Sequence, residues 1–169
     1  PFTRMIAAPA DHTFCYYNGY VDQTSSHASQ LAKSVCFFSP IQFLFWYDRP
    51  AVAKDEPELE FWKHLPTTWD ETKVLHSKIG SYAVVARRKS RDWFVGCLNA
   101  VEPRTFDVAL DFLPKGQRFV AHIYRDDTAV PTSTKVGIER RHVSPKTVLR
   151  VSMGKQGGVA IRIVSRKAD

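Results

Sequence analysis

Carboxyl groups are the side chains of this sequence that could carry acid–base chemistry. Hydrolysis of a glycosidic bond, for example, needs two carboxyl groups that face each other, one of them kept protonated by its surroundings. Asp11, which follows an apolar stretch and precedes His12, is placed most like a member of such a site. Trp69-Asp70-Glu71 is a second candidate, because a tryptophan beside two acids can bind a sugar ring and its hydroxyl groups.

The other acids, serines and histidines give weaker signals. We expect Asp55, Glu56, Glu58 and Glu60 to be solvated or to pair with a helix dipole, because they lie in a loop and at a helix start. Adjacent residues at a helix start cannot face each other, so Ser25, Ser26 and His27 are interpreted as capping residues rather than as a nucleophile and its base. His64, His76, His122 and His142 belong to no catalytic or metal-binding motif, so each is interpreted as a surface or packing histidine.

Cysteine spacing argues against a zinc site. Cys15, Cys36 and Cys97 are far apart, no Cys-x-x-Cys occurs, and no histidine follows at metal-ligand spacing. We expect these cysteines to behave as small buried hydrophobic residues. No glycine-rich phosphate loop occurs, and Gly157-Gly158 reads as a hairpin turn.

Composition and charge bound the function further. The 169 residues are 44% hydrophobic, which is enough for one substantial core. No apolar run is long enough to span a membrane, and we expect no membrane partner. Net charge is −2 over residues 1–78 and +9 over residues 79–169. Because the basic residues of the second half fall at expected strand ends and turns, and no nucleic-acid-binding motif accompanies them, we expect no nucleic-acid partner.

The first part of the chain is helical and aromatic. The spacing of Ala28, Leu31 and Val35 predicts a helix over 25–38, which Ser25 or Ser26 would cap. The run from Phe43 to Tyr47 has no polar alternation, which is typical of a segment between two packed units. A short helix is predicted over 57–64, with Pro57 near its first position.

After residue 67 the hydrophobic period changes from 3.6 to 2, which predicts strands. Turn residues separate eight of them, over 72–79, 82–89, 93–100, 104–112, 118–125, 134–142, 147–151 and 158–164. Short connections indicate antiparallel neighbours. The predicted fold is therefore mainly β, with an antiparallel sandwich of about eight strands over 66–169 and a different, partly helical unit over 1–65.

Several motifs in order resemble the C-terminal stretch of glycoside hydrolase family 97, the α-glucosidase and α-galactosidase family. They are Pro1-Phe-Thr-Arg-Met5, Pro9-Ala-Asp11-His-Thr13, His27-Ala-Ser-Gln-Leu31-Ala32, Ser39-Pro-Ile-Gln-Phe43, Pro66-Thr-Thr-Trp-Asp-Glu-Thr72 and Val84-Val-Ala-Arg-Arg88. The sequence departs from the family's Gly-Pro-x-Asp-Tyr pattern at Ala8 and His12.

The resemblance implies that residues 1–65 end a catalytic (β/α)8 barrel and that a larger parent protein acts on an α-linked oligosaccharide. The strand over 1–8 would be a late barrel strand, with Asp11 and His12 in a loop on the substrate side. The catalytic carboxylates, and the glutamates that hold calcium in the family, would lie before Pro1, so this chain would carry neither catalyst nor cofactor. The family is typically periplasmic or secreted and bacterial.

Structural roles are expected for the remaining candidates. Phe43, Phe45, Trp46 and Tyr47 would pack between barrel and sandwich, with Trp69, Asp70 and Glu71 as an interdomain staple, so that the rest of the parent chain is the expected partner. Isolated, the chain would expose some of this apolar surface and could self-associate.

Two alternatives stay open on the residues alone. One is a carbohydrate-binding sandwich that uses Trp69, Trp93 or Tyr82 as a sugar platform. The other is a small hydrolase in which Asp11 and Glu71 lie within about 10 Å of each other.

Overall fold

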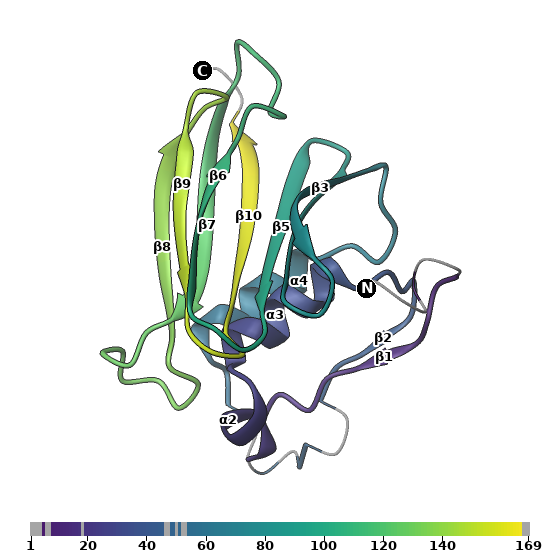
Figure 1. Ribbon diagram of the computed structural model, residues 1–169, viewed down its shortest axis with the longest axis vertical. Coiled ribbons are helices and arrows are strands. Elements are labelled where there is room, and N and C mark those ends of the chain that lie inside the picture. The colour runs from purple at the N-terminus through teal and green to yellow at the C-terminus, as the bar shows by residue number, and fades with distance from the viewer. Residues whose placement is uncertain are drawn as a thin grey trace.

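A computed structural model of the chain describes residues 5, 8–17, 19–45, 48, 49, 51 and 54–166. Its main feature is an antiparallel sheet in the order β3-β4-β5-β10-β7-β8. A two-stranded antiparallel ribbon, β6-β9, lies over one face (Figure 1). The bounds are β3 Glu71–Lys78, β4 Tyr82–Lys89, β5 Asp92–Asn99, β6 Arg104–Ala109, β7 Arg118–Asp126, β8 Val136–Val143, β9 Val148–Met153 and β10 Gly158–Arg166. The predicted mainly β fold is confirmed.

The larger hydrophobic core lies between the sheet and the ribbon. Side chains alternate along each strand, so Leu149, Val151 and Met153 of β9 point inward and are nearly inaccessible to solvent. They meet Ile161 and Ile163 of β10, together with the inward residues of β5 and β7. Two layers of this kind form a sandwich, although one layer has six strands and the other has two.

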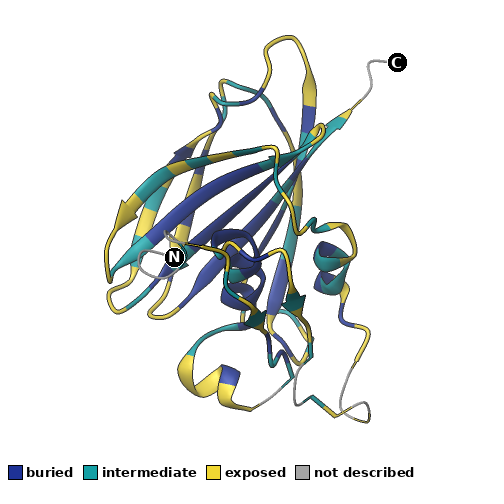
Figure 2. Ribbon diagram, turned by 90° about the vertical axis from the view of Figure 1, so that its right-hand side faces the viewer, coloured by how far each residue is buried: buried dark blue, intermediate teal, exposed yellow. Residues whose placement is uncertain are grey.

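The opposite face of the sheet is covered by helix α3, His27–Cys36. Ala28, Leu31 and Val35, the residues that predicted the helix, form a second core with Phe94 of β5 and Ala160 of β10. Figure 2 shows the buried colour along both the central strands and the helix packed on them. The sheet therefore has a hydrophobic layer on each side.

α3 approaches the sheet closely where the strands carry glycine. A Cβ built on Gly96 of β5 would lie 2.6 Å from the carbonyl oxygen of Ala32, and one on Gly158 of β10 would lie 2.5 Å from the Cα of Ser29. The absence of a side chain at these two positions allows helix and sheet backbones to touch.

The helix predicted over 57–64 is a 3-10 turn, η1 (Pro57–Leu59), followed by α4 (Glu60–His64). Phe61 of α4 is fully buried in the second core. Helix α2, Tyr20–Thr24, was not predicted. No helix in the described ranges is long and apolar enough to cross a membrane.

Two short strands lie apart from the sandwich (Figure 1). β1, His12–Thr13, pairs with β2, Gln42–Phe43, and the pair is parallel. α2 and α3 connect the two strands, so the segment has a strand–helix–strand arrangement. The strand predicted over 1–8 falls largely outside the described residues, as do Trp46 and Tyr47.

Candidate functional site

Aromatic side chains join the parallel strand pair to the helices that cover the sheet. This aromatic junction consists of Phe14, Tyr16, Tyr17, Phe45 and Trp62. The Tyr16 and Trp62 ring centroids lie 4.7 Å apart, and those of Phe14 and Trp62 lie 5.7 Å apart. Phe45 stacks on Tyr17 at 5.8 Å and meets Trp62 edge-on at 5.9 Å. Edge-to-face and stacked ring contacts add to the stabilisation that comes from buried apolar area, and they favour a particular arrangement of the rings.

Three glutamates at alternate positions attach the η1–α4 segment to different parts of the molecule. Glu58 accepts a hydrogen bond of 2.8 Å from the Tyr16 hydroxyl, and Glu56 accepts one of 3.2 Å from the backbone N–H of Ser133. Glu60 accepts hydrogen bonds from Tyr124 of β7 at 2.8 Å and from Arg140 of β8 at 2.6 Å. We call Glu56, Glu58 and Glu60 the glutamate clamp.

We expected these acids to be solvated or to pair with a helix dipole, and solvation is wrong for two of them. Glu58 is 0% exposed and Glu56 is 7% exposed. Burying a carboxylate is costly unless donors reach it, and here the donors come from residues 42 and 77 positions away in sequence. Burial, followed by the nearby charge of Glu58, raises the pKa of Tyr16, so its hydroxyl stays protonated and can donate.

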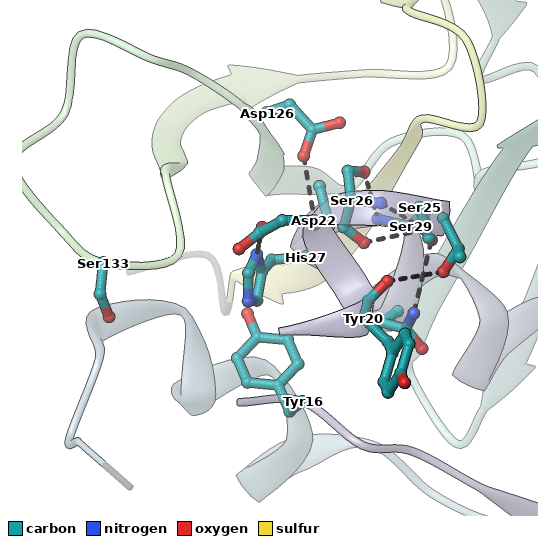
Figure 3. A network of polar contacts seen from close by, with 12 residues as sticks. Tyr16, Tyr20, Asp22, Ser25, Ser26, His27, Ser29, Asp126 and Ser133 are labelled. Atoms are coloured by element: carbon teal, nitrogen blue, oxygen red, sulfur yellow. Dashed lines mark hydrogen bonds and ion pairs between the residues drawn. The ribbon is translucent and has the colours of Figure 1, made fainter. Parts of the chain in front are cut away.

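A polar network fixes the start of α3 (Figure 3). The Ser26 side chain accepts from Ser29 N–H at 3.2 Å, and the Ser29 hydroxyl accepts from Ser26 N–H at 3.3 Å, which is a capping box. Asp126, at the end of β7, accepts from the backbone N–H of Ala28 at 3.3 Å. His27 is buried, with Nδ1 3.4 Å from a carboxylate oxygen of Asp22. Ser26 is thus confirmed as a cap rather than a nucleophile.

Asp11 and His12 lie at the start of the parallel pair, where β1 begins. Asp11 is exposed and precedes β1, whereas the ring of His12 packs edge-on against Phe14 at 4.4 Å and Phe37 at 4.6 Å. Burial, with Lys33 nearby, lowers the pKa of His12 to about 4, so the imidazole is neutral near pH 7. His12 and Phe14 therefore face the helices, and Asp11 and Thr13 face away from them.

Trp69, Asp70 and Glu71 lie where β3 begins. Asp70 accepts from Ser90 N–H at 2.7 Å, and Glu71 is bonded to Arg88 at 3.1 Å and to Lys73 at 2.9 Å. These partners of the two acids belong to β3 and the β4–β5 hairpin. Trp69 packs 5.5 Å from Phe94 in the core under α3, so it alone of the three contacts the helix side.

Residues named for the two alternative functions have partners within the sandwich. Hydrogen bonds from Lys73 and Arg88 hold the pKa of Glu71 below its usual value, so Glu71 suits the ionised member of a carboxyl pair and not the general acid. Trp93 is only 2% exposed, and Tyr82 packs against Phe106 at 4.8 Å with the Arg104 guanidinium 5.0 Å from its ring. Neither residue presents an open ring face for a sugar.

The cysteines and acids of the described residues do not assemble a metal centre. Cys36 and Cys97 are buried, as expected from the sequence, and Cys15 is half-buried. Within the described ranges, no three His, Cys, Asp or Glu side chains form a group that could hold a metal ion.

The glutamate clamp was missed because its partners are distant in sequence. One signal was present: acids at 56, 58 and 60 around Pro57 occur where a 3-10 turn and a helix begin. The hydrogen bonds of these acids to Tyr16, Ser133 and Tyr124 form only in the folded chain, so the local sequence could not predict them.

The chain is similar in sequence to one protein family and to several known proteins. Residues 68–164 match a family described as Glycosyl-hydrolase 97 C-terminal, oligomerisation. The chain is 32% identical over 176 residues to a retaining alpha-galactosidase of Bacteroides thetaiotaomicron, covering 96% of this chain and 26% of that protein. It is 32% identical over 115 residues to a probable retaining alpha-galactosidase of Streptomyces bingchenggensis, covering 65% of this chain and 17% of that protein.

Solved structures show the same fold. An enzyme from Pseudoalteromonas sp. strain K8, in complex with acarbose, aligns with a TM-score of 0.82 and 29% identity over 97% of this chain and 27% of its own. The chain thus spans about a quarter of the length of this structure and of the Bacteroides protein.

Proposed function

Because the chain belongs to glycoside hydrolase family 97 and matches its C-terminal region, we propose that it forms part of an exo-acting α-glycosidase, an α-galactosidase or α-glucosidase. Its own task is structural: residues 66–169 form a sandwich that supports residues 1–65, the last part of a catalytic (β/α)8 barrel. The reacting carboxylates belong to the remainder of the larger protein.

One observation carries this proposal. A parallel strand pair connected through a helix is the repeating unit of a (β/α)8 barrel, and here the connecting helix is packed on the sandwich. The glutamate clamp and the aromatic junction hold the pair to the same sheet. A rigid attachment of this kind would keep the last barrel strands in place beside a catalytic site.

The substrate and partner assignments follow from the family. The Bacteroides relative is named a retaining alpha-galactosidase and the Streptomyces relative a probable one, which supports an α-linked galactoside as the substrate of the whole protein. The rest of that protein is the partner of residues 1–65, and we place Thr13 of β1, with Asp11 just before the strand, toward it. Calcium, where the whole protein binds it, is held by residues other than those described, and no step is assigned to it.

A chimera tests the proposal. The Bacteroides thetaiotaomicron enzyme is built with its C-terminal quarter replaced by this chain and, separately, with that quarter deleted. We expect the chimera to hydrolyse a nitrophenyl α-galactoside and the deletion variant to lose at least about a hundredfold in kcat/KM, because a displaced barrel strand misplaces the catalytic groups.

The 169-residue chain alone is the matched control and should release no nitrophenol above the blank. An enzyme-like rate from the chain alone would overturn the structural role. So would a deletion variant that keeps full activity.

A further inference from the structure

A cavity of about 380 Å³ opens between the six-stranded sheet and the β6–β9 ribbon, on the side where β8 and β9 are edge strands. We call it the arginine cavity. Its lining comes from four strands: Ile123, Arg125 and Asp126 of β7, Glu139 and Arg141 of β8, Leu149, Arg150, Val151 and Ser152 of β9, and Val159 of β10. Cavities of this volume accommodate small molecules.

The base of the arginine cavity is buried and apolar. Ile123, Leu149, Val151 and Val159 belong to the larger core and are each at most 8% exposed. Arg125 and Arg141 lie on the same face of the sheet as Ile123, because β7 and β8 pair Ile123 with Glu139 and Ala121 with Arg141. The charged side chains therefore border a floor that the fold holds in place.

The charge inside the cavity is positive. Glu139 lies 3.1 Å from Arg125 and 3.7 Å from Arg141, so one carboxylate is shared by two guanidinium groups. The carboxylate of Asp126 is directed to Ala28 N–H, at the start of α3. Arg150 alternates with the inward Leu149 and Val151 of β9, so its side chain lies on the outer face of the ribbon, across from Asp107 of β6. Two arginines, Arg125 and Arg141, therefore face one local carboxylate, which leaves binding capacity for another anion.

Backbone groups add to this capacity. Within the described residues β9 pairs only with β6, so its second edge, beside Arg150 and Ser152, has peptide groups that take no part in strand pairing. Such groups can donate to and accept from hydroxyls. In a ligand with a carboxylate and several hydroxyls, the carboxylate could bind the arginines on one side, and the hydroxyls could bind the peptide groups of the second edge of β9 on the other.

We propose that the arginine cavity binds a carboxylate-bearing monosaccharide unit, such as a hexuronate. The planar guanidinium groups suit a carboxylate, to which arginine can form two parallel hydrogen bonds. The choice of a sugar acid over other carboxylates rests on the proposed function, whereas the anion site itself does not. Since Arg125 and Arg141 are 52% and 43% exposed, the expected dissociation constant is on the order of 1 mM.

The experiment is an NMR titration of the ¹⁵N-labelled 169-residue chain with galacturonate at low ionic strength. We expect saturable shifts confined to residues of β7, β8 and β9 that line the cavity, weakened by added sodium chloride. Galactose and inorganic phosphate are titrated in parallel. Equal binding of galactose would overturn the role of the carboxylate, and equal binding of phosphate would overturn the sugar acid in favour of a general anion site.

Variants locate the binding. Arg141→Gln should weaken galacturonate binding by up to about fivefold, the range of an exposed ion pair. Glu139→Gln should tighten it, because the internal competitor for both guanidinium groups is removed. Arg91→Gln, on the β4–β5 turn outside the cavity, is the matched control and should change nothing.

The spectrum of each variant reports its fold. No saturable shift with the unmodified chain, or equal losses from Arg141→Gln and Arg91→Gln, would overturn the proposal. Both readouts are independent of glycosidase activity, so the chimera and the titration can fail separately.

Discussion

At the scale of single residues, the aromatic junction is held by buried acids that accept hydrogen bonds from distant parts of the chain. Glu58 is the clearest case, because its side chain is fully buried and reaches Tyr16 across 42 positions of sequence. Its Oε2 atom has no hydrogen-bond partner among the described residues. Among the described residues, the hydrogen bond from Tyr16 is therefore the one on which this carboxylate depends.

Tyr16→Phe should destabilise the chain. The substitution keeps the ring that packs on Trp62 and removes the hydroxyl that donates to Glu58. Leaving a buried carboxylate without its donor is expected to lower the free energy of unfolding by about 1–3 kcal/mol. Urea denaturation followed by tryptophan fluorescence measures the change.

Tyr17→Phe is the control for this loss. The Tyr17 hydroxyl donates to the carbonyl oxygen of Lys54 at an exposed site, and its removal should change the free energy of unfolding by less than about 0.5 kcal/mol. Equal effects of the two substitutions would contradict the role given to Glu58.

At the scale of elements, α3 is the part that belongs to both halves of the chain. It connects β1 to β2, and its apolar face forms a core with β5, β7 and β10. Its start is fixed by Ser26 and by Asp126 of β7. The sheet, in turn, admits the helix because two central strands have glycine at the points of closest approach.

Gly96→Ala should therefore be costly although alanine is small. Its Cβ would lie within 3.0 Å of Ala32, Val35 and Cys36, two of them through backbone or Cβ atoms that cannot swing away. Overpacking of this kind is expected to cost about 1–3 kcal/mol in the free energy of unfolding, measured by thermal and urea denaturation.

The control is Gly19→Ala. Gly19 has a helical φ of −58°, and a Cβ there would meet no atom within 4 Å. The change should be neutral or slightly stabilising, since alanine reduces the freedom of the unfolded chain. If both glycines tolerated alanine, α3 would not be packed on the sheet as closely as described.

Elements with a local signal, either a repeated period or a helix-starting proline, were predictable, and elements without such a signal were not. The strand predicted over 82–89 is observed at Tyr82–Lys89, because alternation and flanking turns are local signals. The strand predicted over 104–112 ends earlier, at Ala109, where pairing with β9 stops. β1 and β2 have two residues each, too few for any period, and exist through each other's hydrogen bonds.

At the scale of the whole molecule, a run of partly exposed apolar side chains lies along the parallel pair. Phe38, Ile41, Phe43 and Leu44 are 38%, 51%, 42% and 36% exposed, and they follow one another along the β2 region. In the larger protein, the proposed barrel would continue here. In the isolated chain, this surface meets water.

We expect the isolated chain to associate in a concentration-dependent way through this surface. The double variant Ile41→Ser/Leu44→Ser should shift the chain toward the monomer mass in size-exclusion chromatography with light scattering. Val148→Ser, a comparably exposed residue on β9, should leave the distribution unchanged. A monomeric unmodified chain, or an equal effect of the Val148 variant, would contradict the prediction.

The close packing of α3 on the sheet also determines where this chain can be truncated without exposing its core. A protein shortened to the segment that matches the family, residues 68–164, would lack α3 and would expose Phe94, Tyr124 and Ala160 to solvent. Anyone who wishes to crystallise or transplant the sandwich would have to carry the upstream helix along with it. The natural unit for engineering is thus longer than the unit that sequence families delimit.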